Sequence, residues 1–146
     1  MDWEKNIITQ TAGIRDLLAG TKTIAVLGIK TEAQANAPAF YVPSYLQQAG
    51  FQVIPVPVYY PDVMQILGQK VYRRLIDVSV EIDLLNVFRR SQDVRPHLEE
   101  ILAKKPKAVW LQSGIRDDAV AEALAQADIK VVQDRCLMVE HRRLGI

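Results

Sequence analysis

The chain has 146 residues, of which 49% are hydrophobic and 24% charged, and its formal net charge is +1. The length suits one domain spanning residues 1–146, and the near-neutral charge argues against a nucleic-acid or membrane-surface partner. No apolar run is long enough to cross a membrane, and the first residues lack the apolar core of a signal sequence. The single cysteine, Cys136, excludes an internal disulfide, so we expect a cytoplasmic protein.

The first predicted element is an amphipathic helix over residues 2–19, which ends at Gly20. Gly13 weakens its helix propensity near the middle. The apolar face consists of Ile7, Ile8, Ile14, Leu17 and Leu18.

A βαβ unit follows, and it organises the rest of the chain. The short apolar run at residues 23–28 predicts a strand that is buried on both faces, and residues 51–56 predict a second strand. Between them we expect a helix that begins near Phe40 and ends at Gly50, with Pro43 in its first turn. Such a unit makes a parallel sheet, so the first strand should be central and should present residues 28–31 to a ligand.

The next segment contains prolines and then loses its pattern. Pro57 and Pro61 predict a stiff, extended loop, and residues 62–76 predict only short helical pieces, interrupted at Gly68.

Three more apolar runs alternate with helical patterns. The predicted strands are residues 82–88, 108–112 and 130–133. The helices after the first two should be capped by Ser91 or Asp93 and by Asp117 or Asp118, and one or two helical turns should follow from residue 137 to 143. The alternation predicts an α/β fold: a three-layer, Rossmann-like, doubly wound sheet of about five parallel strands.

Cations follow four of the five predicted strands. Lys30, Arg89, Arg90, Arg116 and Arg135 would make a basic pocket at the carboxyl edge, in a chain of nearly zero net charge. That asymmetry indicates an anionic ligand. The alternative is that the arginines lie on solvated loops or pair with Asp117, Asp118 and Asp134.

The usual nucleotide-binding devices are absent. The turn after the first strand has one glycine, and no acidic residue ends the second strand, so an NAD fingerprint is missing. The sequence also has no Walker-type phosphate loop. The sheet therefore resembles that of a nucleotide binder without the motifs for NAD or ATP.

Few residues suggest catalysis. His97 and His141 lie in charged segments, which favours solvated side chains over catalytic ones. Asp134 and Glu140 could form an acid–base set with His141, although structural ion pairing is favoured. Cys136 follows Arg135, so it is either a reactive thiol or a small packed hydrophobe.

Several segments together resemble the small stand-alone CoA-binding proteins of bacteria and archaea. These proteins are similar in fold to the CoA-binding domain of the succinyl-CoA synthetase alpha subunit. The resemblance extends from about Ile14 to Leu144, and its most specific parts are Phe-Arg-Arg-Ser at residues 88–91 and Trp-Leu-Gln-Ser-Gly-Ile-Arg at residues 110–116.

The resemblance implies coenzyme A as the ligand, held across the carboxyl edge of the sheet. It implies that the phosphates contact Gly28, Ile29 and Lys30, and that the adenosine end is flanked by Val56, Pro57 and Tyr59. Phe88, Arg89 and Arg90 would lie under the pyrophosphate and pantetheine. The pantetheine arm would run along Gln112, Ser113, Gly114 and Ile115.

Two departures from the family pattern concern the nucleotide end. Relatives commonly open the helix after the first strand with Arg-Pro-Ser-Tyr, where this chain has Ala37, Pro38, Ala39 and Phe40. They often carry a lysine after the second strand, where this chain has Tyr59.

The resemblance supplies no reaction, because the related synthetases use a phosphorylated histidine on another domain. We therefore expect a module that binds CoA or an acyl-CoA without chemistry of its own, and a ligase or synthetase is the candidate partner. The alternative is a thiol-dependent redox or acyl-transfer enzyme that uses Cys136. An NAD-type oxidoreductase is disfavoured by the missing fingerprint.

Overall fold

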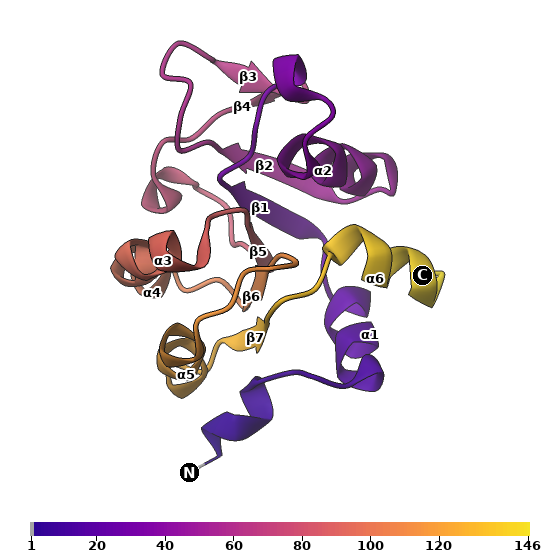
Figure 1. Ribbon diagram of the computed structural model, residues 1–146, viewed down its shortest axis with the longest axis vertical. Helices are drawn as coiled ribbons and strands as arrows, with labels where there is room; N and C mark the ends of the chain where they lie inside the picture. The colour runs from indigo at the N-terminus through magenta and orange to yellow at the C-terminus, as the bar shows by residue number, and fades with distance from the viewer. Residues whose placement is uncertain (1) are drawn as a thin grey trace.

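A five-stranded sheet lies between two layers of helices in the computed structural model, which describes residues 2–146 (Figure 1). Neighbouring strands are all parallel, in the order β2–β1–β5–β6–β7. The predicted α/β doubly wound sheet is therefore confirmed. The strands are β1 (Thr23–Leu27), β2 (Gln52–Val56), β5 (Leu84–Val87), β6 (Ala108–Leu111) and β7 (Lys130–Val132).

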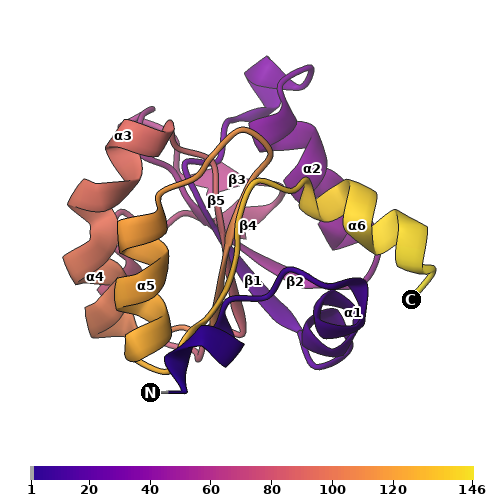
Figure 2. The ribbon, with the colours of Figure 1, turned by 60° about the horizontal axis from the view of Figure 1, so that its bottom comes forward.

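Helices cover both faces of this sheet, as Figure 2 shows. One face carries α1 (Thr11–Ala19), α2 (Pro38–Gln48) and α6 (Leu137–Leu144). The other carries α3 (Ser91–Val94), α4 (Leu98–Lys104) and α5 (Asp118–Gln126). Short 3-10 turns complete the chain: η1 (Trp3–Asn6), η2 (Glu32–Gln34), η3 (Leu75–Asp77) and η4 (Arg95–His97).

Each strand contributes to two separate cores. In β1, Ile24 and Val26 pack into the core beneath α1, α2 and α6, while Ala25 and Leu27 pack into the core beneath the other helices. All four are at most 2% exposed. Alternate side chains point to opposite faces, so a strand covered on both faces must be apolar throughout.

The predicted position of the first strand needs correction. β1 lies inside the sheet, between β2 and β5, but the middle strand is β5. The chain places β2 on one side of β1 and then puts β5, β6 and β7 on the other. The direction of winding therefore reverses between β1 and β5, and ligands bind beyond the carboxyl ends of the strands at such a point.

The predicted helix over residues 2–19 is wrong in its first half. Only residues 11–19 form a regular α-helix. Ile7 pairs with Val131 in a parallel bridge, and the amide of Ile8 donates to the Val131 carbonyl at 2.8 Å. These apolar residues cover the free edge of β7, and this long-range contact overrides their helical spacing.

Helix α2 begins at Pro38, two residues before the predicted start, so Pro43 lies inside it. A proline has no N–H to donate to the carbonyl four residues earlier, here Ala39. The Ala39 carbonyl instead accepts the backbone N–H of Lys30, at 3.1 Å. Pro43 is therefore tolerated because the carbonyl it leaves free is used to hold the turn after β1.

Within residues 62–76, where only short helical pieces were predicted, a small hairpin forms at residues 65–70, and the helical turn η3 begins at the end of the segment. β3 (Gln65–Ile66) and β4 (Gln69–Lys70) are antiparallel, and the turn places both Leu67 (φ 55°) and Gly68 (φ 72°) in the left-handed region. Glu32 accepts the Leu67 N–H at 2.8 Å, and Gln47 donates to the Leu67 carbonyl at 2.9 Å. Contacts from distant segments thus stabilise a turn that leucine does not favour.

The two predicted helix caps have different outcomes. Asp117 caps α5 as predicted, accepting the N–H groups of Ala119 and Val120. Neither Ser91 nor Asp93 caps the helix after β5, since α3 has no side-chain cap. Their side chains bond instead to the Arg116 backbone and to the Arg90 guanidinium, respectively.

Candidate functional site

A cavity of about 690 Å³ opens at the carboxyl edge of the sheet, at the point where the winding reverses. Its volume is within the range of small-molecule sites. The lining comes from the ends of β1, β5 and β6, from the start of α2 and from the residue before α6. The lining residues are Lys30, Ala37, Pro38, Ala39, Tyr41, Phe88, Arg89, Arg90, Ser91, Gln92, Gln112, Ser113, Gly114, Ile115 and Cys136.

Many of the residues predicted from sequence lie together in this lining. Lys30 comes from the turn after β1, Phe88, Arg89 and Arg90 follow β5, and residues 112–115 follow β6. The sequence prediction missed Tyr41 and Gln92, for which the pattern of strand ends gives no signal, and it placed Ser91 at a strand end without counting it as a site residue. It noted residues 37–39 only as departures from a family motif. Pro38 was a usable signal, because proline favours the first turn of a helix, and a helix that follows the first strand begins at the carboxyl edge of the sheet.

Other predicted residues support the cavity from outside it. Ile29 is 1% exposed and packs in the core, and Val56 and Pro57 are buried at the end of β2. None of these lines the cavity.

Gly28 also lies outside the lining, and the structure shows why a glycine is needed there. Its φ is 87°, and a Cβ at this position would lie 2.3 Å from the carbonyl oxygen of Phe88. The glycine therefore permits the chain after β1 to pass close to the Phe88 carbonyl at the edge of the site, and its expected contact with a ligand phosphate stays a prediction.

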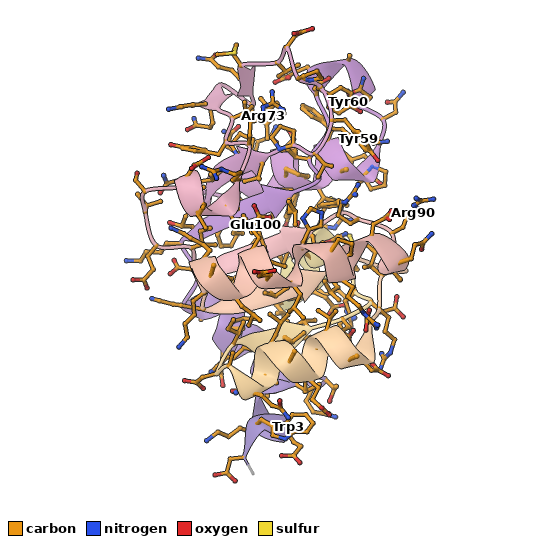
Figure 3. All side chains as sticks on the ribbon, turned by 90° about the vertical axis from the view of Figure 1, so that its left-hand side faces the viewer. Trp3, Tyr59, Tyr60, Arg73, Arg90 and Glu100 are labelled. Carbon is orange, nitrogen blue, oxygen red and sulfur yellow. The ribbon has the colours of Figure 1, made fainter. Side chains whose placement is uncertain are left out.

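Tyr59 is exposed and reaches the site through Arg89. Arg89 donates through Nη1 to the Tyr59 hydroxyl at 3.4 Å, and its guanidinium carbon lies 5.6 Å from the centre of the Tyr59 ring. Arg73 fixes this loop by donating to the carbonyls of Tyr59, Tyr60, Pro61 and Val63 (Figure 3). The loop turns at Tyr60, whose φ is 65°, so it is not extended throughout as predicted.

Arg89 is the best-oriented cation of the cavity. Its Nε donates to His97 Nε2 at 3.3 Å, so that nitrogen is an acceptor and the ring proton of neutral His97 is on Nδ1. Nδ1 lies 3.5 Å from Glu100 Oε1, and the other oxygen of Glu100 accepts the Leu75 N–H at 3.1 Å. A chain from Glu100 through His97 thus orients the guanidinium.

The position of His97 corrects the sequence prediction. It was predicted to be a solvated residue of a charged helix start, but its side chain is 19% exposed and is held between Arg89 and Glu100.

Gln112 has a fixed orientation in the cavity wall. It is 4% exposed, and its Oε1 accepts both Asn86 Nδ2 at 3.1 Å and the Leu137 N–H at 3.0 Å. Its Nε2 has no hydrogen-bond acceptor within residues 2–146 and remains available to a ligand. A donor fixed in this way favours a carbonyl or phosphate oxygen.

The start of α2 adds positive potential to the cavity. Ala37 is the N-cap and provides no side-chain hydrogen bond, and the side chains at Pro38 and Ala39 are small. The N–H groups at a helix start carry partial positive charge and bind anions. This end of the cavity therefore combines the helix terminus with Lys30 and Arg89.

The remaining arginines at this edge are mostly paired with carboxylates. Arg90 binds Asp93 at 2.8 Å, Arg95 binds Asp117 at 2.9 Å and Arg116 binds Asp118 at 3.1 Å. Of the predicted strand-end arginines, Arg116 therefore pairs with Asp118 as the alternative supposed, whereas the partner of Arg90 is Asp93, which the alternative did not include. Lys30 and Arg89, in contrast, form no ion pair within residues 2–146.

One of these ion pairs lowers the pKa of an aspartate. The Arg95 guanidinium donates to the Asp117 carboxylate and lowers the pKa of Asp117, with help from the N–H groups at the start of α5. Asp117 therefore stays ionised at lower pH than an ordinary aspartate.

His141 was expected to be solvated, but it is buried. Its Nδ1 lies 2.8 Å from the Tyr45 hydroxyl, and its ring packs edge-on against Phe51. Glu140 turns to Arg143 and Arg135, at 3.2 and 3.8 Å. The favoured interpretation, ion pairing, therefore holds for Glu140.

The described residues give no sign of a metal site or a membrane span. No group of three or more His, Cys, Asp or Glu side chains within residues 2–146 is placed to hold a metal ion. Over the same residues, no helix has the length and apolar character needed to cross a membrane.

Comparison with known proteins gives a consistent result. A sequence profile of the family described as "CoA binding domain" matches residues 22–142. The chain is 31% identical over 130 residues to YneT, an uncharacterized protein of Bacillus subtilis (strain 168), and the match covers 89% of this chain and 93% of that protein.

Solved structures are similar over nearly the whole chain. One is cell-free ID.343 of Thermus thermophilus, at 43% identity and a TM-score of 0.84, covering 93% of this chain and 99% of that one. Another is a hypothetical protein of Pyrococcus horikoshii OT3, at 28% identity and a TM-score of 0.83, covering 94% of each chain.

Proposed function

The chain belongs to the CoA-binding domain family, and on this premise we propose that it binds coenzyme A, or an acyl-CoA, in the cavity at the carboxyl edge of its sheet. One observation carries the proposal. Lys30 and Arg89 are brought to one cavity without an ion-pair partner within residues 2–146, next to an open helix start. Such a site suits a polyanionic ligand.

The phosphates belong at the β1–β5 end of the cavity in this proposal. There the Lys30 ammonium, the Arg89 guanidinium and the first turn of α2 surround the same space. Arg90 also lines the cavity, but its pairing with Asp93 leaves it less charge to offer. We therefore expect Arg89 to contribute more affinity than Arg90.

The pantetheine arm belongs over residues 112–115. This arm has amide groups that both donate and accept hydrogen bonds, and Gln112 Nε2 supplies a fixed donor for one of its oxygens. Ile115 and Phe88 offer apolar contact along the same wall. The arm then ends near Ser113 and Cys136.

The adenosine end belongs near Tyr59. This ring is 62% exposed and is held by Arg89, so it offers an aromatic face for a base. Tyr59 replaces a lysine common among relatives, and Ala37 and Ala39 replace polar residues. We therefore expect the 3′-phosphate to contribute less to affinity here than the pyrophosphate does.

Titration calorimetry with CoA, dephospho-CoA, NAD and ATP tests the proposal. We expect CoA to bind most tightly, and dephospho-CoA to bind nearly as well because the expected contacts to the 3′-phosphate are missing. NAD and ATP lack pantetheine and should bind at least about tenfold more weakly. Binding of NAD in preference to CoA would refute the proposal.

In this proposal the protein is a binding module without chemistry of its own, and its partner would be a ligase or synthetase. A second candidate, a thiol-dependent redox or acyl-transfer enzyme, is favoured by one observation: Cys136 is half-buried and lines the same cavity. Release of free CoA from acetyl-CoA by the wild-type protein, abolished in Cys136→Ser, would favour the enzyme. Absence of turnover would favour the binding module.

A further inference from the structure

A second cavity, of about 520 Å³, adjoins the first near the ends of β6 and β7. The two cavities share Ser113 and Cys136. The second is lined by the extended segment at residues 7–9, by the residues that follow β7 and by the start of α6. A ligand that follows the strand ends from β1 to β6 therefore reaches the second cavity next.

We infer that this second cavity holds the acyl group of an acyl-CoA, and that it prefers an acyl group ending in a carboxylate. The inference rests on the proposed function, because it needs CoA to lie with its phosphates by Lys30 and Arg89. That orientation points the sulfur of CoA toward Ser113 and Cys136. Anything attached to the sulfur then lies at the boundary of the two cavities.

Gln112 lines the first cavity beside this boundary, and its Nε2 carries two N–H groups, so one can serve a thioester carbonyl while the other serves the pantetheine arm. Its carbonyl oxygen is fully occupied by the Asn86 amide and the Leu137 N–H, at 3.1 and 3.0 Å. Its Nε2 is therefore a donor of fixed direction, on a residue that is only 4% exposed. Gln112 directly precedes Ser113, which lines both cavities. We therefore place the thioester carbonyl of the ligand near Gln112 Nε2.

Arg135 gives the second cavity its preference for a carboxylate. It donates through Nη2 to the Thr9 carbonyl at 2.9 Å, and its Nη1 lies 3.8 Å from Glu140 Oε1. Glu140 is 6% exposed and also binds Arg143 at 3.2 Å, so two guanidinium groups share one carboxylate. A guanidinium has five N–H donors, and most of those of Arg135 remain for a ligand.

The other charged groups of the lining, and Gln133, have partners within residues 2–146, although Asp134 is held by a backbone N–H and forms no ion pair there, so its negative charge remains. Arg116 binds Asp118 at 3.1 Å, and Asp134 Oδ1 accepts the Gly114 N–H at 2.6 Å. Gln133 uses both ends of its amide, toward the Asp117 N–H and the Asp118 carboxylate. A long alkyl chain would desolvate these polar groups without bonding to them, so it fits this cavity poorly.

Calorimetric titration with CoA, pentanoyl-CoA and glutaryl-CoA tests the inference, because the two acyl groups have equal length and differ in the terminal carboxylate. We expect glutaryl-CoA to bind about tenfold more tightly than pentanoyl-CoA. Arg135→Gln should remove this difference. Equal affinities for the two in the wild-type protein would overturn the inference.

Val139→Trp tests the place of the acyl group. Val139 lines the second cavity and not the first, and it is 38% exposed, so tryptophan can be accepted at the surface. The variant should bind glutaryl-CoA about tenfold more weakly and CoA within twofold of the wild type. Val80→Trp is the matched control, since Val80 is 42% exposed and lines neither cavity, and both affinities should be unchanged there.

The outcomes separate the two proposals. Unchanged glutaryl-CoA affinity in Val139→Trp, with normal CoA binding, would overturn the acyl site alone. Failure of wild-type protein to bind CoA at all would overturn the proposed function, and the acyl site with it.

Discussion

Replacing Arg89 with glutamine removes the charge that the structure aims most directly at the cavity. The guanidinium is held by His97 Nε2 at 3.3 Å and the Tyr59 hydroxyl at 3.4 Å, so it is already oriented before a ligand arrives. A hydrogen bond to a charged group contributes about 1.5–3 kcal/mol. At about 1.4 kcal/mol per tenfold change in Kd, Arg89→Gln should weaken CoA binding roughly 10- to 150-fold.

The same change should affect folding much less. Arg89 has no carboxylate partner within residues 2–146, and its contact with the exposed Tyr59 ring contributes about 0.5–1 kcal/mol. Calorimetry with CoA, paired with urea unfolding, separates the two effects. Arg95→Gln is the matched control, because Arg95 pairs with Asp117 and does not line the cavity.

The control should keep its CoA affinity within about twofold while losing up to about 1 kcal/mol of stability. The reasoning would be refuted if Arg89→Gln bound CoA as tightly as the wild type does. It would be equally refuted if the Arg89 and Arg95 variants lost the same affinity.

Three further predictions concern single residues. Gly28→Ala should lower the free energy of unfolding by at least about 2 kcal/mol in urea, through left-handed strain and the clash with the Phe88 carbonyl; wild-type stability would contradict this. The pKa of Asp117 is lower in the folded protein, so its ionised carboxylate stabilises the fold above about pH 4. This stabilisation is lost as the pH falls through the folded-state pKa. Asp117→Asn keeps a side chain that can cap α5 but has no carboxylate to protonate. On acidification below about pH 4, its urea midpoint should therefore fall less than that of the wild type, and an equal fall would contradict this. With CoA disulfide, Cys136 should form a mixed disulfide and release one CoA thiol, an adduct visible by intact mass and missing in Cys136→Ser; a wild-type protein without adduct would show an inaccessible thiol.

The features that sequence predicted well are those set by local pattern. Apolar runs gave the five strands, because a strand covered on both faces has no polar positions. Parallel strands bring their carboxyl ends to one edge, so Lys30, Arg89 and Gln112 could be placed together from topology alone.

Other features depend on contacts between distant residues, and the sequence pattern does not encode them. Pro43 fits inside α2 only because the Lys30 N–H uses the Ala39 carbonyl. The left-handed turn at Leu67 depends on Glu32 and Gln47.

The orientation of Arg89 was beyond prediction for a similar reason. The sequence shows His97 and Glu100 only as members of a charged helix. Their spacing of three residues sets them on one side of that helix, but only the fold brings this side against the segment that follows β5.

An NMR titration of backbone amides with CoA would test the central claim most directly, because it reports binding and its location together. We predict saturable shifts concentrated at residues 28–30, 37–39, 88–91 and 112–115, which come from four separate elements around one cavity. Residues that line the opposite end of the sheet, such as Gly13, Asp83 and Lys130, should shift little. Shifts concentrated at that opposite end, or no shifts at millimolar CoA, would contradict the account.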